Sequence, residues 1–136
     1  MNEARDRLIL GVGLSSGAEA EALLALALAV LREAGRKAVD LTGIASLEGR
    51  IGHPAIRSLA IRMDRPLLGY PACRLAGQTV PTPSARVTEL TGSPSVAEAA
   101  ALEGAGTGAR LLVNKRRASL LTCALAHGEG SEFDWD

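Results

Sequence analysis

The sequence contains few aromatic residues: one Phe, one Trp and one Tyr among 136 residues. Single-stranded nucleic-acid sites stack bases on aromatic rings, so this scarcity argues against that class of protein. The formal net charge is zero, so no overall basic field attracts a polyanion. The apolar share is 47%, and the core has to be built from Ala, Leu, Ile and Val. We therefore expect no nucleic-acid partner.

Long apolar runs and export signals are also lacking. The longest apolar segment, Ala22 to Leu31, is too short to span a bilayer. The start, MNEARDR, mixes both charge signs and is unlike a secretory signal. Cys73 and Cys123 lie far apart without a pairing motif, which indicates reduced thiols. The two histidines lack metal-ligand spacing. We expect a cytoplasmic protein with no membrane contact, no metal and no cofactor.

Strand and helix patterns alternate along the chain. We expect strands at residues 7–12, 38–45, 66–70, 110–114 and 120–127, and helices at 18–34, at 54–64 and from Ser95 onward. The last two strands are joined by the short segment KRRAS, so they should pair antiparallel. This order predicts an α/β fold of three layers, α/β/α, with a mixed, mainly parallel sheet of about five strands. Residues 1–128 should form a single domain, followed by a disordered acidic tail at 129–136.

A long loop is predicted after the third strand. The segment Pro71 to Arg86 contains three prolines and little periodicity, with one helical turn around Cys73. A short helix is expected from Ser84 to Leu90. Because long loops in small domains are usually functional or mobile, this segment is a candidate lid over a ligand.

The stretch LILGVGLSSGAEAEALL combines a strand, a glycine-bearing turn and a helix. Gly11, Gly13 and Gly17 would let a ligand approach backbone N–H groups at the helix start. A dinucleotide site needs Gly-x-Gly-x-x-Gly and an acid at the close of the second strand, whereas the nearest acid opens that strand. Three interpretations stay open: a plain turn, a nucleotide site, or a pocket for a carboxylate-bearing ligand that uses the hydroxyls of Ser15 and Ser16.

The stretch LTGIASLEGR is expected at the end of the second strand. If the two strands are parallel, its polar residues Thr42, Gly43 and Ser46 lie near the first loop, since ligands bind at the carboxyl ends of strands in open α/β sheets. The alternative is a solvated connector.

The helix that begins after Ser95 has a capping signature, because Glu98 follows three positions later. These groups serve the helix first, but a helix start with little bulk is also an anion site. Lys115 directly follows the predicted fourth strand, so it either points inward or belongs to a solvated charged turn.

Six blocks carry a resemblance to a known family: LGVGLSSG, LTGIASLEGR, PLLGY, GSPSVAEAAALEGAG, LLVNKRRAS and LLTCALA. In this order, from about Leu8 to Ala126, the sequence resembles the cobalamin-biosynthesis family of CobE and the C-terminal domain of CbiG. The block from Ser95 to Leu102 is the most specific part, and Lys115 adds to it.

The resemblance implies a function in cobalamin (vitamin B12) biosynthesis. The expected ligand is a precorrin-type tetrapyrrole, held as a carrier or as an accessory to a pathway enzyme, and other enzymes of the pathway would be partners. CbiG opens the δ-lactone of a cobalt-precorrin and releases acetaldehyde, so lactone hydrolysis is the alternative. Its general base would be Glu98 or Glu48, and no catalytic residue is assigned. A nucleotide-binding module is the second alternative.

A precorrin carries acetate and propionate groups, so its recognition needs scattered anion contacts. The expected ligand-binding residues are Gly11, Gly13, Ser15, Ser16, Thr42, Gly43, Ser46, Ser95, Glu98 and Lys115.

Overall fold

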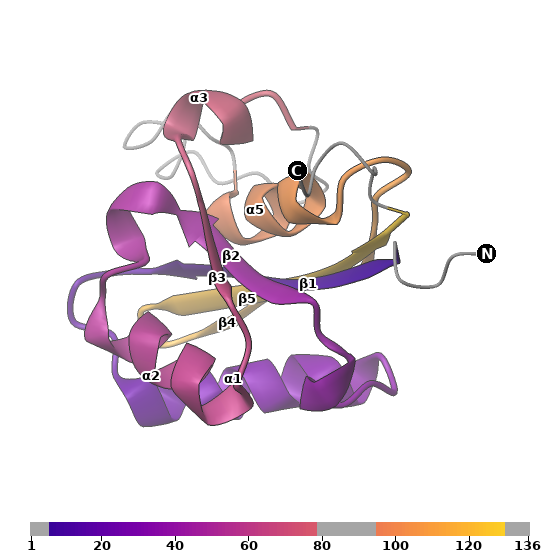
Figure 1. Cartoon of the computed structure of the whole chain (residues 1–136). Coiled ribbons are helices and arrows are strands. Elements are labelled where there is room, and N and C mark those ends of the chain that lie inside the picture. The colour runs from indigo at the N-terminus through magenta and orange to yellow at the C-terminus, as the bar shows by residue number, and fades with distance from the viewer. Residues whose placement is uncertain (1–5, 79–94, 130–136) are drawn as a thin grey trace.

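Five strands form one sheet in the order β3-β2-β1-β5-β4 (Figure 1). The computed structural model describes residues 6–78 and 95–129. The strands are β1 (Arg7–Leu14), β2 (Gly43–Leu47), β3 (Leu67–Tyr70), β4 (Arg110–Ala118) and β5 (Leu121–Gly128). β1, β2 and β3 are parallel, whereas β5 is antiparallel to both β1 and β4. The mixed sheet is therefore confirmed: four strands point the same way, but only two of the four pairings are parallel.

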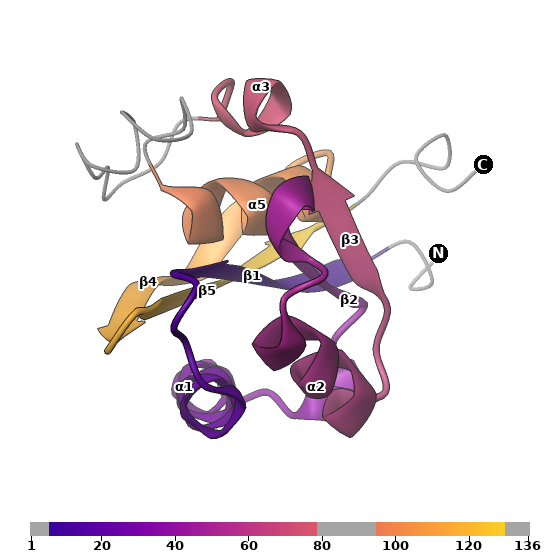
Figure 2. The same cartoon turned by 90° about the vertical axis from the view of Figure 1, so that its left-hand side faces the viewer.

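Helices cover both faces of the sheet, which confirms the three layers (Figure 2). The helices α1 (Ala20–Glu33) and α2 (Pro54–Met63) cover one face. The helix α5 (Val96–Ala105) covers the other, and α3 (Ala72–Leu75), the predicted turn around Cys73, lies over it. The helix expected at 84–90, the loop beyond residue 78 and the tail beyond Glu129 lie outside the described residues.

Local signals explain the bounds of α1 and α2. Gly35 takes a φ of 68° just after α1, which ends the helix in the usual way. Pro54 occupies the first turn of α2, and Asp64 ends that helix in the left-handed region. The apolar character of α1 does not by itself mark its buried face, because Leu28 is 41% exposed. The buried positions of α1 are Leu23, Ala27, Val30 and Leu31.

The second strand begins later than predicted. Residues 38–40 form a short 3-10 helix, and β2 starts at Gly43 and continues through Ser46 to Leu47. The Asp40 carboxylate accepts the backbone N–H of Lys37 at 2.8 Å, and this contact folds the segment into a turn. Ser46 therefore lies inside a strand, whereas the predicted strand ends at residue 45.

The fourth strand runs through the charged segment predicted to be a link. β4 extends to Ala118, so a turn at residues 119–120 connects it to β5. β4 is an edge strand, and charged residues are well tolerated at a sheet edge.

The core differs in kind between the two faces. Under α1 and α2 the buried residues are mostly Leu, Ile and Val, whereas under α5 they are mostly Ala. Across residues 6–78 and 95–129, no helix has the length and apolar character needed to cross a membrane.

Candidate functional site

Gly11 and Gly13 lie inside strand β1, under helix α5, and not in a ligand-binding loop. A Cβ atom at Gly11 would lie 1.9 Å from the carbonyl oxygen of Ala97 and 2.8 Å from the nitrogen of Ala101. The glycines in the left-handed region are Gly35, Gly106 and Gly108 in the described part of the chain. The expectation of a ligand cradle at Gly11 and Gly13 is therefore wrong, because these residues let a helix approach the sheet. The nucleotide interpretation loses its motif with them.

Ser15 and Ser16 lie where predicted, in the exposed turn after β1. The Ser15 N–H donates to the carbonyl oxygen of Leu120 at 3.0 Å, which joins this turn to the β4–β5 connection. The carbonyl oxygen of Ser16 lies 2.9 Å from Nε2 of His53. Nδ1 of His53 accepts the N–H of Ala55 at 3.0 Å, so Nε2 carries the proton and donates. His53 thus fastens the turn to the start of α2, a role that the sequence did not indicate.

Ser46 is 1% exposed, and its hydroxyl donates to the carbonyl oxygen of Val12 at 2.7 Å. Side chains alternate along a strand, and Ile44 packs in the cluster under α1 and α2. The Ser46 side chain therefore faces that side of the sheet, away from α5.

Thr42 and Gly43 lie at the opposite end of β2 from Ser46. The Thr42 hydroxyl accepts the N–H of Leu8 at 3.1 Å, and Gly43 pairs with Ile9 near the start of β1. Because β2 begins later than predicted, the structure does not bring these two residues to the carboxyl ends of the strands.

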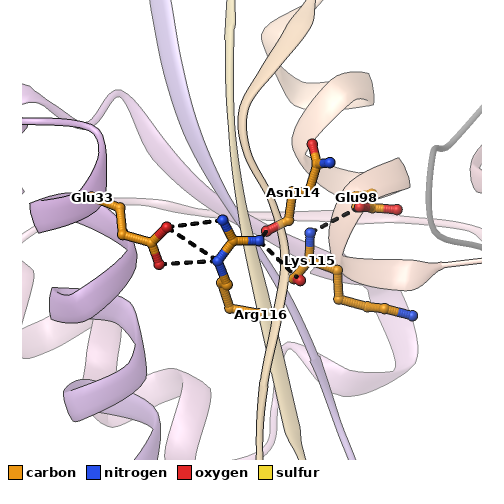
Figure 3. Close-up of polar contacts among 5 residues, drawn as sticks. All are labelled: Glu33, Glu98, Asn114, Lys115 and Arg116. Atoms are coloured by element: carbon orange, nitrogen blue, oxygen red, sulfur yellow. Dashed lines mark hydrogen bonds and ion pairs between the residues drawn. The ribbon is translucent and has the colours of Figure 1, made fainter.

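The start of α5 brings Ser95, Glu98 and Lys115 together. Ser95 is 1% exposed and its hydroxyl accepts the N–H of Glu98 at 3.4 Å, which confirms the predicted N-cap. Glu98 is fully buried, and its Oε2 accepts the backbone N–H of Lys115 at 2.8 Å (Figure 3). Gly13 lies beneath the same turn of the helix. This cluster is at the carboxyl end of β1, on the α5 face.

The side chain of Lys115 is half-buried and extends away from Arg116 (Figure 3). Burial is the main cause that lowers the pKa of Lys115, and the charge of Arg117 lowers this pKa further, while Glu98 opposes the shift. The ammonium group thus pays a solvation cost in the folded chain, which a bound anion would offset.

Arg116 projects to the other face and anchors β4 to α1. Its guanidinium donates to both carboxylate oxygens of Glu33, from Nη2 to Oε1 at 2.9 Å and from Nε to Oε2 at 3.0 Å. This pair lowers the pKa of Glu33 through the hydrogen bond from Arg116. Within the charged segment KRRAS, Arg116 is therefore structural, whereas its neighbour Lys115 belongs to the cluster at the start of α5.

The predicted site residues thus divide into groups. Ser95, Glu98 and Lys115 form one cluster at the start of α5. Ser15 and Ser16 lie at the same end of the sheet, whereas Ser46 faces the opposite layer. The predicted ligand-binding residues therefore do not form one site, because Ser46 and Ser95 lie on opposite faces of the sheet.

By its fold and its α5 cluster, the chain is a three-layer α/β/α protein in which an alanine-rich helix packs closely on the sheet. The match to known families is specific within that class. Residues 8–126 match the family described as "Cobalamin synthesis G C-terminus". The chain belongs to this family of cobalamin biosynthesis proteins, as its sequence blocks predicted.

Individual relatives agree with this assignment. Protein CobE of a Sinorhizobium species is 40% identical over 121 residues, which cover 88% of this chain and 79% of that protein. The crystal structure of CobE, a protein from the cobalamin (vitamin B12) biosynthetic pathway, superposes with a TM-score of 0.84 and 38% identity, covering 90% of this chain and 93% of that one. The cobalamin biosynthesis protein chiG of Agrobacterium tumefaciens gives a TM-score of 0.66 at 27% identity, with coverages of 88% and 96%.

Proposed function

We propose that the chain binds a precorrin-type tetrapyrrole at the start of α5, as a carrier or as an accessory to another enzyme of the cobalamin pathway. The observation that carries this proposal is the position of Lys115. Its backbone N–H binds Glu98 in the first turn of α5, and its side chain is half-buried, so a positive charge and a helix start, both favourable for a carboxylate, occur in the same region. The family membership supplies the ligand class, because precorrins are ringed with carboxylates.

The magnitudes are adequate for such a ligand. A hydrogen bond to a charged group contributes about 1.5–3 kcal/mol. Several such bonds along one edge of a macrocycle approach the roughly 8 kcal/mol that corresponds to micromolar affinity. Ser15 and Ser16, which are exposed at the same end of the sheet, add hydroxyl donors.

Lactone hydrolysis is less well supported by the geometry. Of the two predicted bases, Glu48 is exposed in the short helix that follows β2. Glu98 is fully buried and accepts the N–H of Lys115. A general base has to reach a water molecule at the substrate. Glu98 instead accepts a backbone hydrogen bond from β4 and so supports that strand.

A titration tests the proposal directly. The chain is titrated with hydrogenobyrinic acid, a carboxylated corrinoid, and the visible absorbance is followed. The sequence holds two lysines, so Lys115→Ala has a matched control in Lys37→Ala, at an exposed position before the short helix that precedes β2. We expect Lys115→Ala to weaken binding by about tenfold, which corresponds to roughly 1.4 kcal/mol, and Lys37→Ala to leave the affinity unchanged.

Two results would overturn the proposal. One is the absence of any spectral change at about 100 μM ligand, which corresponds to less than roughly 5.5 kcal/mol of binding free energy. The other is an equal loss of affinity in both lysine variants, which would indicate a general charge effect. Release of acetaldehyde from a lactone-bearing precorrin by the wild-type chain would establish the hydrolase instead.

A further inference from the structure

A cavity of about 930 Å³ lies beside the last turn of α5 and reaches along β4 to Asn114, the neighbour of Lys115. Its lining residues include members of α3 and α5, which cover the same face of the sheet. Its lining includes residues from the end of α5, from α3 and from the first residues of β1 and β4. The volume falls in the range of small-molecule sites, about 300–1,000 Å³. None of the ten residues predicted from the sequence lines this cavity.

Three arginines line the cavity: Arg7, Arg74 and Arg110. Arg7 opens β1 and Arg110 opens β4, and both lie beside the end of β5, where they pair with Gly128 and His127. Arg74 comes from α3, across the cavity. Two of the three arginines thus come from the same end of the sheet, and the third comes from α3.

Two of these guanidinium groups are held in place by the protein. Arg7 is 5% exposed, and its Nη1 donates to the carbonyl oxygen of Gly104 in the last turn of α5 at 3.2 Å. Arg74 lies over the ring of Tyr70, with 5.2 Å between its Cζ and the ring centroid, and forms an ion pair with Glu103. Holding a side chain before binding reduces the entropy that a ligand has to offset.

The local charge differs from that of the whole chain. The formal net charge of the chain is zero, yet the lining residues within 6–78 and 95–129 include three arginines and one carboxylate, Glu103. Leu102 and Leu111 add aliphatic surface to the lining. Guanidinium groups bind carboxylates and phosphates through paired hydrogen bonds, and Arg74 already takes a carboxylate partner.

We propose that this cavity is a second binding site, for an organic anion that carries at least two carboxylates on an aliphatic framework. The carboxylates bind between Arg7, Arg74 and Arg110, and the framework contacts Leu102 and Leu111. Glu103 competes with the ligand for Arg74 and so sets the affinity. The site shares no residue with the α5 cluster that holds the proposed tetrapyrrole, so either proposal can fail without the other.

Calorimetric titration of the full chain with citrate at low salt tests this site. We expect one saturable site. Arg110→Gln removes an exposed guanidinium at the cavity and should weaken binding about fivefold or more, because one charge-assisted contact is lost. The matched control, Arg32→Gln, removes an exposed arginine from α1 on the other side of the sheet and should leave the affinity unchanged. Arg7 is left intact because it supports the end of α5.

A variant with the opposite sign sharpens the test. Glu103→Gln removes the competing carboxylate and should strengthen citrate binding several-fold. Unsaturable binding, or equal weakening in Arg110→Gln and Arg32→Gln, would overturn the site. Inorganic phosphate that binds as tightly as citrate would overturn the assignment to organic carboxylates.

Discussion

The close contact between α5 and the sheet makes Gly11→Ala the sharpest test of the structure. A Cβ atom there would lie 1.9 Å from a backbone oxygen of α5, whereas ordinary contact begins at 3.4 Å. The helix would have to withdraw by about 1.5 Å at this point, the difference between those two distances. The obstacle is backbone and cannot rotate aside. Overpacking costs about 1–3 kcal/mol even when side chains can adjust, so we expect a loss of about 3 kcal/mol or more.

Urea unfolding measures this loss. With a slope of about 2 kcal/mol per M, the midpoint of Gly11→Ala should fall by about 1.5 M. Gly49→Ala is the control, because no atom lies within 4 Å of a Cβ built there. Gly13→Ala should be intermediate, since the nearest atom, at 2.6 Å, is the side-chain hydroxyl of Thr122, which can rotate. A midpoint for Gly11→Ala equal to that of Gly49→Ala would refute the close packing of α5.

Three further predictions concern buried and half-buried groups. Glu98→Ala should lower the free energy of unfolding by about 2 kcal/mol, because the Lys115 N–H loses its acceptor; Glu98→Gln keeps an acceptor oxygen, and equal losses in chemical denaturation would contradict this role. Burial lowers the pKa of Lys115, so the folded chain holds this proton less tightly than the unfolded chain does. Lys115→Met should therefore raise the free energy of unfolding at neutral pH, with the gain vanishing above pH 10.5, and a destabilised variant at pH 7 would exclude this cost. Burial raises the pKa of Cys123 from 9.0 to about 12, so a thiol reagent should label Cys73 in the folded chain and both cysteines only after unfolding. Above about pH 9 the unfolded chain alone releases the Cys123 proton, so stability should fall as pH rises by about 1.4 kcal/mol per pH unit relative to Cys123→Ala; parallel pH profiles would contradict the burial.

The fold could be predicted where its signals are local. Gly35, Pro54 and Ser95 mark helix ends through their own backbone or side-chain chemistry, and the structure uses each in that way. The order of strands and helices then restricts the topology to a layered α/β sheet. Strand limits were less accurate: a local contact between Asp40 and Lys37 makes a turn where a strand was predicted, and the extension of β4 depends on its pairing with β5.

The site could be predicted only in part, because the same sequence motif can have different structural roles. Gly-x-Gly before a helix is compatible with a ligand loop, but here the spacing admits α5, a helix far along the chain. The cluster of Ser95, Glu98 and Lys115 could be predicted from the sequence in part, since the capping pattern places Ser95 and Glu98 together at the helix start. The arginine cavity was not, because Arg7, Arg74 and Arg110 come from three distant segments whose meeting depends on the antiparallel return of β5.

The contact between α5 and the sheet, which is built from alanine and glycine, also determines where the sequence of this chain can diverge. Beneath α1 and α2, a leucine can be exchanged for another large aliphatic residue at modest cost. Beneath α5 the smallest side chains already occupy the contact, and almost any replacement enlarges it. Substitutions that this fold tolerates should therefore accumulate in the layer of α1 and α2, while the layer of α5 keeps its alanine and glycine residues.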